Sequence, residues 1–550
     1  MITPIIRIGG SSLLSSIQKE KQTALGFIDE NRGWLSDFHR EIWGYAEPAF
    51  REYRSAAAYV KLLREEGFEV EEGSGAMPTA FCAVWGEGKP VIGGFAEYDA
   101  VPGCSQAAVP YRKPRDEGLH PWAAGHTDPH SALGTASLFG FLAAKRAMEE
   151  HGLRGTLKLL GEPAEKVCGS KPVHAAKGYY DDLDASLPYH PSGINAVRRE
   201  IQGGSYYNTL YTFETINPEN WFRPRDVPFR IAGHAGGRIP AALDAVCLMY
   251  TATKYVEDAM LPYTAYWTLN EYIMVGGQAT SDNLPPRIAQ IQYAHRAPLL
   301  EMQEQIQRVL DNTAKGVAQI TGTRATKRII TKTRCGLTNV TLSEILYRNL
   351  EMVGPPRFSE EARKFGREIQ ESLGYEAVED PFTRECQEVQ PIGGPDEATR
   401  RDFPSWVTTQ GSDDYVEYQW TAPSTRLYTA NATLRLPDPE AVVPSWARYA
   451  LNGYSPCIDP GIVTAAKTIG ATIVDLLTHP DELAKARAEF VERTGGGVGG
   501  SKWVAPLLPR DFYPPINLPW PEYVTTQRGF EWSLTKPGPE KEYQVLHEGL

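Results

Sequence analysis

The chain has 550 residues, of which 42% are hydrophobic and 23% are charged, and its formal net charge is −12. This length exceeds what one hydrophobic core usually supports, so we expect two folded domains of ordinary globular composition. The acidic balance argues against nucleic acid or an anionic membrane as the main partner.

Seven cysteines are dispersed along the chain without a Cys-x-x-Cys pair. An odd, scattered set in a long chain is typical of reduced thiols in a cytosolic protein, not of a disulfide framework. The first 19 residues lack the charged start and long apolar core of a signal peptide, and no apolar window approaches the length of a membrane span. We therefore expect a cytoplasmic protein.

The N-terminal part alternates helical and β-rich patterns. After a loose extension at residues 1–20, apolar residues recur at helical spacing from 21 to 67, with a break at Ala46-Glu-Pro48. Short β-rich runs follow at 68–70, 79–85 and 91–95. The last of these runs leads into the acidic turn Glu97-Tyr-Asp99. Ligands of open α/β sheets gather at such carboxyl ends of strands.

The stretch from Gly125 to Gly134 contains three candidate metal ligands, His126, Asp128 and His130, directly before an apolar helical pattern. Side chains two apart share a face of extended backbone, so these groups can point the same way. Taken alone, the loop is more typical of a polar helix cap, since a metal needs a further ligand from another segment. Two later strands supply such groups, because they end in acids or a histidine at 161–166 and 184–191.

Alternating strands and helices predict an α/β fold with a mostly parallel sheet. Near residue 196 the pattern changes, and two helices with several strands fit a small inserted α+β domain. The glycine tract 494–500 predicts a flexible linker before a Pro- and Trp-rich tail. We divide the chain into an N-terminal extension, a first catalytic segment, an inserted lid or dimerisation domain, a second catalytic segment and a C-terminal extension, at 1–20, 21–195, 196–336, 337–490 and 491–550.

Several motifs resemble, in order and spacing, the aminoacylase/carboxypeptidase-type zinc metallopeptidase (amidohydrolase) family. The likeness is greatest to its branch of aminobenzoyl-glutamate hydrolases and indole-acetyl-amino-acid hydrolases. The matching residues are 46–52, 97–103, 125–134, 161–166, 185–191, 233–235 with 242–245, and 412–420. The resemblance implies a catalytic domain that binds two metals through one bridging ligand, with an inserted lid that often dimerises.

By this resemblance Asp128, His130 and His190 are ligands of one metal ion. Asp128 stands where the branch usually has a cysteine and the wider family a bridging aspartate. The second metal would need a glutamate where this chain has Lys166, and a late histidine, yet no histidine occurs between 295 and 479. A protonated lysine cannot ligate, so we interpret Lys166 as a substitute for the missing cation and expect one divalent ion per chain. Zn²⁺ or Mn²⁺ suits this ligand set best, with Fe²⁺ as a further option.

Glu165 matches the family's general base, which takes a proton from bound water and delivers it to the leaving nitrogen. Asp99 resembles the aspartate that orients a ligand by hydrogen bonding, although a turn-capping role fits nearly as well. His126 is an extra ligand, a support for one, or a surface residue. A buried structural histidine is the alternative for His190, and an exposed loop acid for Glu165.

On the inserted domain, His234 matches the histidine that completes an oxyanion hole, commonly from a neighbouring subunit. Asn283 and Arg296 stand where the family holds a substrate carboxylate, although a structural salt bridge is an even alternative for Arg296. An aromatic cluster at 206–221 has no counterpart in the family, and it either lines a substrate pocket or packs the lid.

These features predict a metal-dependent hydrolase of a C–N bond, with an aromatic, carboxylate-bearing small molecule as substrate. The leading hypothesis is hydrolysis of the amide of an N-acyl, aromatic-acyl amino acid. The second is deamination of an electron-poor aromatic amine, as in the divergent relative nitroanthranilate aminohydrolase. The third is a non-catalytic binding or assembly protein on the same fold. We expect a homodimer or larger homo-oligomer formed through the lid.

Overall fold

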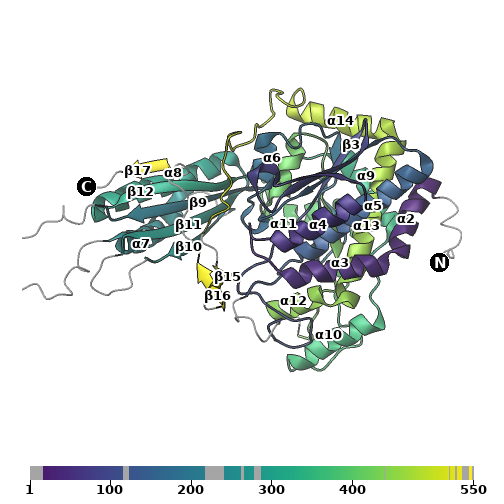
Figure 1. The fold of residues 1–550 in the computed structure, drawn as a ribbon, viewed down its shortest axis with the longest axis horizontal. Helices are drawn as coiled ribbons and strands as arrows, with labels where there is room; N and C mark the ends of the chain where they lie inside the picture. The colour runs from purple at the N-terminus through teal and green to yellow at the C-terminus, as the bar shows by residue number, and fades with distance from the viewer. Residues whose placement is uncertain are drawn as a thin grey trace, which may run out of the picture.

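The computed structural model places the chain in two bodies, each built on its own five-stranded sheet (Figure 1). It describes residues 17–115, 123–216, 241–261, 266–277, 286–438, 440–518, 521–526, 529–534 and 544–547. The larger body contains both the N-terminal helices and the helices after residue 340, so the second body is inserted between two halves of the first.

The central sheet of the larger body has the order β1-β2-β4-β3-β5. Strand β3 is parallel to both β4 and β5, whereas β1 with β2 and β2 with β4 are antiparallel. The strands are β1 (Glu69–Glu72), β2 (Phe81–Glu87), β3 (Val91–Ala96), β4 (Gly155–Gly161) and β5 (Ala185–Ser186).

The sheet is therefore mixed, whereas the alternating pattern predicts a mostly parallel one. Connection length explains the difference. Only residues 73–80 join β1 to β2, and only residues 88–90 join β2 to β3. Parallel strands need a crossover of about a dozen residues or more, so the chain reverses at both short links, and β4 lies between β2 and β3 in the sheet.

Helices cover the sheet and supply most of the core of the larger body. Helix α5 packs against β3 and β4, and both α13 and α2 pack against α5. The helices are α2 (Lys19–Glu30), α3 (Arg32–Tyr45), α4 (Tyr53–Glu65), α5 (His130–His151), α6 (Lys171–Lys177), α9 (Val340–Val353), α10 (Glu360–Ser372), α11 (Gly394–Asp402), α12 (Ser445–Gly453), α13 (Ser455–Thr478) and α14 (Pro480–Thr494).

Glycine allows α5 and α13 to approach closely. A Cβ at Gly140 would lie 2.8 Å from the Ile469 side chain and 3.1 Å from the Ala466 carbonyl oxygen. This contact fixes α5 in the interior, and α5 begins at His130, one of the candidate ligands. Core packing thus sets the position of the site.

Helix α13 corrects one expectation from the sequence. Its 24 residues are long and apolar enough to cross a membrane by length and composition, with a mean hydropathy of 1.3 in its most apolar window. However, 83% of that window is buried inside the protein. The apolar character of α13 is that of a core helix.

Short strands extend the larger body beside the candidate site. Strand β14 (Leu427–Ala430) pairs in parallel with β6 (Tyr189–Ser192) and antiparallel with β7 (Ala196–Val197). In this register His190 lies opposite Tyr428. Strand β8 (Gln202–Gly203) pairs in parallel with β13 (Thr409–Gln410) where the chain leaves for the second body.

The second body is an antiparallel sheet of order β10-β11-β9-β12-β17, with two helices packed on it (Figure 1). Its buried core is separate from that of the first body. The elements are β9 (Ser205–Glu214), α7 (Ala242–Met260), β10 (Thr268–Val275), β11 (Ile288–Ala297), α8 (Leu300–Thr321), β12 (Arg324–Lys332) and β17 (Gln544–His547).

The C-terminal segment runs back from the first body to the second. The glycine tract forms a hydrogen-bonded turn, in which Lys502 N donates to Thr494 O at 2.9 Å, where the sequence predicts a flexible linker. Strands β15 (Pro521–Thr526) and β16 (Gly529–Leu534) form a hairpin, and β17 then joins the edge of the second sheet.

Candidate metal and catalytic site

The candidate site lies at the carboxyl ends of β3 and β4, where ligands of α/β sheets gather. Glu97 and Asp99 follow β3, and Glu165 and Lys166 form the short 3₁₀ turn after β4. The loop before α5 supplies Asp128 and α5 itself supplies His130, while His190 comes from β6. The fold thus brings four separate segments of the chain to one place.

His130 is at the centre of this group and is fully buried. Its Nδ1 lies 2.5 Å from Asp99 Oδ1, so its Nε2 faces the other acids. That Nε2 is 3.3 Å from Glu97 Oε2 and 3.2 Å from Glu165 Oε2. Burial opposes the protonated form of His130, but these carboxylates hold the pKa of its imidazole well above the usual range.

His190 and Asp128 form the adjacent side of the site. His190 Nδ1 contacts the Pro191 carbonyl oxygen at 2.6 Å, which turns Nε2 toward the site. Asp128 Oδ2 lies 3.5 Å from His190 Nε2 and 3.7 Å from His130 Nε2. The three ligands expected from the sequence therefore point toward a common place.

Lys166 lies beside these groups. Its ammonium donates to Asp128 Oδ1 and lies 3.8 Å from Glu165 Oε2, and its backbone N–H donates to Asp99 Oδ2 at 2.9 Å. Burial would raise the pKa of Asp128, but the charge of Lys166 keeps that pKa well below its usual range. Lys166 thus supplies a fixed positive charge next to one oxygen of Asp128, while the other oxygen faces the two imidazoles.

Glu165 is largely buried, with 11% of its side chain exposed. Burial opposes its charge, yet His130 and Lys166 hold the pKa of its carboxyl below the usual range. Glu165 is a charged carboxylate that contacts His130, a candidate metal ligand. In this position it can accept a proton from a water molecule at the site. This geometry is compatible with the role of base.

Glu97 is a member of the site for which the sequence motifs suggested no role. Its Oε1 accepts a hydrogen bond from Lys171 Nζ at 2.7 Å, and its Oε2 faces His130. The spacing of Glu97 and Asp99 could have predicted this, because side chains two apart on extended backbone share a face and Asp99 was already a candidate. The partner Lys171 carried no signal, because it lies in a separate helix, α6.

The donor set fits a divalent metal ion. Ligand atoms of Glu97, His130 and His190 all lie within 4.8 Å of one another. Among the described residues, neither Glu97 Oε2 nor His130 Nε2 has a hydrogen-bond partner, although both are buried. Buried polar atoms are nearly always satisfied, and a cation would satisfy both.

A second group of candidate ligands, Glu165, Cys168 and Asp414, is less suited to a cation. Burial and the nearby acids raise the pKa of the Cys168 thiol well above its usual range, and only the thiolate binds metals well. Lys171 Nζ already donates to Asp414 Oδ1 at 2.6 Å. An ammonium group therefore stands where a second ion would need a carboxylate.

Other candidates have different surroundings. His126 is buried and its Nε2 lies 3.4 Å from the Ile42 carbonyl oxygen, so it is neither at the surface nor among the grouped ligands. Glu162, another acid of the 161–166 motif, is held by His174, Tyr180 and Tyr418. His234 and Asn283 lie outside the described residues.

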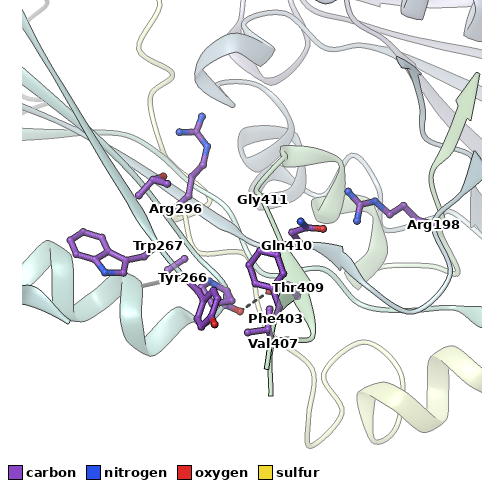
Figure 2. A pocket seen from close by; sticks show the side chains of 12 residues that line it. Arg198, Tyr266, Trp267, Arg296, Phe403, Val407, Thr409, Gln410 and Gly411 are labelled. Atoms are coloured by element: carbon purple, nitrogen blue, oxygen red, sulfur yellow. Dashed lines mark hydrogen bonds between the residues drawn. The ribbon is translucent and has the colours of Figure 1, made fainter. Parts of the chain in front are cut away.

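Arg296 lines a cavity of about 500 Å³ between the two bodies. Figure 2 shows Arg296 and Arg198 on opposite sides of it, with Tyr266 and Phe403 between them. The Arg296 guanidinium lies 4.8 Å from the centre of the Tyr206 ring. Tyr206 in turn belongs to one buried cluster with Cys168, which follows the turn that carries Glu165 and Lys166.

The described part of the aromatic cluster mainly packs the second body. Tyr207 and Tyr211 are buried in β9 and donate their hydroxyls to Glu304 and Asp311 of α8. The ring of Tyr206 lies under the Arg296 guanidinium in a cation–π contact. The aromatic side chains that face the cavity instead come from other segments: Tyr266, Trp267 and Phe403.

No protein-family model matches the sequence. Over 485 residues the chain is 27% identical to a subunit of the p-aminobenzoyl-glutamate hydrolase of Escherichia coli (strain K12), and the match covers 85% of this chain and 94% of that protein. It is 24% identical over 336 residues to Xaa-Arg dipeptidase of Mus musculus, covering 57% and 66% of the two chains. The solved structure of aminobenzoyl-glutamate utilization protein from Klebsiella pneumoniae gives a TM-score of 0.48 at 12% identity, over 81% of this chain and 98% of that chain.

Both curated relatives carry the names of hydrolytic enzymes, and the first aligns over most of both chains. The resemblance indicated by the motifs is therefore confirmed: over most of its length, this chain is similar to the p-aminobenzoyl-glutamate hydrolase subunit.

Proposed function

We propose that the protein is a metal-dependent hydrolase of the amide bond in an aromatic-acyl amino acid, with one divalent ion per chain. The observation that carries this proposal is the contact of Glu165 Oε2 with His130 Nε2 at 3.2 Å, beside Lys166. It puts a charged acid next to a buried imidazole whose inner nitrogen has no hydrogen-bond partner among the described residues.

Asp128, His130 and His190 would hold the ion, and Asp99 fixes the orientation of His130. When bound, the ion supplies the Lewis acidity for activating water. Glu165 takes a proton from the attacking water and returns it to the leaving nitrogen. Lys166 stabilises the negative charge that develops on the substrate oxygen, because its ammonium stays protonated beside Asp128.

Two ammonium groups support a mononuclear site. Lys166 binds Asp128 Oδ1, and Lys171 lies between Glu97 and Asp414. A second cation near either lysine would meet repulsion from a positive charge in a low-dielectric interior. The late histidine expected for a second ion is also missing from the sequence.

The cavity supports the substrate class. Arg296 can bind a carboxylate by a bidentate pair, and Tyr266, Trp267 and Phe403 offer an aromatic wall. We propose that the aromatic-acyl group lies against these aromatic side chains and that Arg296 binds the free carboxylate of the amino acid part. We also propose that the protein forms a homodimer through the second body, which light scattering of the purified protein would test.

Chromatography of products from purified holoprotein and a panel of aromatic-acyl amino acids, including aminobenzoyl-glutamate, tests the activity. Release of the free amino acid is the expected result. Deamination of an electron-poor aromatic amine is the second candidate, favoured by Lys166 in the place of a second ion. Ammonia release from nitro- or amino-substituted benzoates, without amide cleavage, would replace the first proposal by the second.

A further inference from the structure

We propose that Glu97 is an additional ligand of the metal ion, and that buried Lys171 positions its carboxylate for this role. The inference rests on the metal site of the proposed function. It extends the ligand set of Asp128, His130 and His190, and it assigns a role to a lysine that the proposed reaction does not use.

The two oxygens of Glu97 have different surroundings. The side chain is fully buried, and Oε1 accepts a hydrogen bond from Lys171 Nζ at 2.7 Å. Oε2 faces His130 Nε2 at 3.3 Å, and among the described residues neither atom has a hydrogen-bond partner. Leaving a buried polar atom unsatisfied costs about 1–3 kcal/mol, and more for a charged group. A shared cation removes this cost for both atoms.

The spacing agrees with ligands of one ion. Two atoms that each lie about 2.1 Å from the same ion are separated by roughly 3.0–3.4 Å in octahedral or tetrahedral geometry. The separation between Glu97 Oε2 and His130 Nε2 is within this range. The Glu97 ligand atom also lies within 4.8 Å of that of His190. Glu97 thus faces the same point as the two imidazoles.

Lys171 explains why only one oxygen is available. Its ammonium is fully buried, bridges Glu97 Oε1 and Asp414 Oδ1, and lies 4.6 Å from the centre of the Phe95 ring. Burial opposes its charge, but these carboxylates hold the pKa of Lys171 well above its usual value. A lysine that stays protonated cannot ligate, so it fixes one oxygen of Glu97 and directs the other toward the site.

Acidic side chains gather at this point. Glu97, Asp99, Asp128, Glu165 and Asp414 surround His130 and the two ammonium groups of Lys166 and Lys171. Burial and the neighbouring acids raise the pKa of Glu97 and Asp414, so their charged forms are disfavoured here, and a cation at this point would offset that cost. A simple Glu97–His130 ion pair is the competing explanation, and it predicts no effect of Glu97 on metal affinity.

Competition with a chromophoric chelator measures the affinity of Zn²⁺ and Mn²⁺ for the wild-type protein, Glu97→Gln and Glu97→Asp. Loss of a residue that supports a ligand typically costs about 10–100-fold in affinity. We expect both Glu97 variants to lose more than about 100-fold, and Lys171→Met to lose roughly 10–100-fold. Glu97→Asp keeps a carboxylate as the partner of the buried Lys171 ammonium. It therefore tests the role of Glu97 even if Glu97→Gln does not fold.

Glu52→Gln is the matched control. Glu52 is a fully buried acid whose pKa burial raises to about 8, so at neutral pH it is protonated and resembles glutamine. This control should keep wild-type affinity. The d–d absorption of the Co²⁺-loaded protein should change in Glu97→Gln, which loses a ligand, and stay close to wild type in Lys171→Met.

The results separate the two proposals. A wild-type protein that binds no metal would overturn the proposed function and this inference together. A wild-type protein that binds one ion, with Glu97 variants within threefold of its affinity and with an unchanged Co²⁺ spectrum, would overturn only the role of Glu97.

Discussion

The Asp99 carboxylate lies 2.5 Å from His130 Nδ1 and accepts the Lys166 backbone N–H through its other oxygen. One buried acid therefore orients an imidazole and fixes the turn that carries the proposed base. Asp99→Ala should lower metal affinity about 10–100-fold, because His130 loses the contact that sets its tautomer and ring orientation. Chelator competition measures this, and a loss below threefold would contradict the assignment.

Glu165→Gln should keep the metal and lose turnover. The amide cannot accept the proton from water, and general-base catalysis usually contributes about 10²–10⁴-fold. Elemental analysis should give the wild-type metal content, while kcat falls by that factor. Retained activity would remove Glu165 from the role of base.

Lys166→Glu should not create a second metal site. The variant gains a carboxylate at the position where the family has one, but residues 296–478 still contain no histidine. We expect one equivalent of metal per chain in this variant and in Lys166→Met, by elemental analysis after desalting. Two equivalents in Lys166→Glu alone would show that Lys166 by itself excludes the second ion.

Arg296→Gln should weaken the binding of carboxylate-bearing substrates. A hydrogen bond to a charged group contributes about 1.5–3 kcal/mol, which corresponds to a rise in KM of roughly 10–100-fold. Substrate analogues with a neutral amide in place of the carboxylate serve as the control, and their KM should be the same for both proteins. An equal rise for both kinds of substrate would indicate a structural role for Arg296.

His295 should make stability depend on pH. Burial lowers the pKa of His295 to about 4, from 6.5 in an exposed chain. Between these values the unfolded state binds a proton that the folded state does not, so stability is complete above about pH 6.5 and falls as pH drops toward 4. Urea denaturation should show a loss of about 2 kcal/mol from this group between pH 7 and pH 5.

The variant His295→Asn isolates that contribution. It removes the titrating ring, so its stability should fall less over the same pH interval than that of the wild type. An identical pH dependence in both proteins would mean that the imidazole of His295 titrates normally in the folded state.

The sequence by itself determined which residues approach one another at the strand ends. The family resemblance, together with positions at strand ends, predicted the group Asp128, His130, Glu165, Lys166 and His190, and the structure brings these side chains together. Local patterns also predicted helices across residues 21–67 with a break at 46–48, and there α3 ends at Tyr45 and α4 begins at Tyr53. Motif order and helical periodicity depend on residues that are close together in the chain, so they can be recognised from the sequence alone.

Only the tertiary structure decided which partners those residues meet. Glu97, Lys171 and Asp414 are far apart in sequence, and nothing local signals that one ammonium bridges the two acids. The mixed sheet and the cavity between Arg198 and Arg296 likewise depend on how separate segments pack. The physical reason is that burial and charge pairing are properties of assembled surfaces, whereas hydrophobic periodicity and motif spacing are properties of the chain.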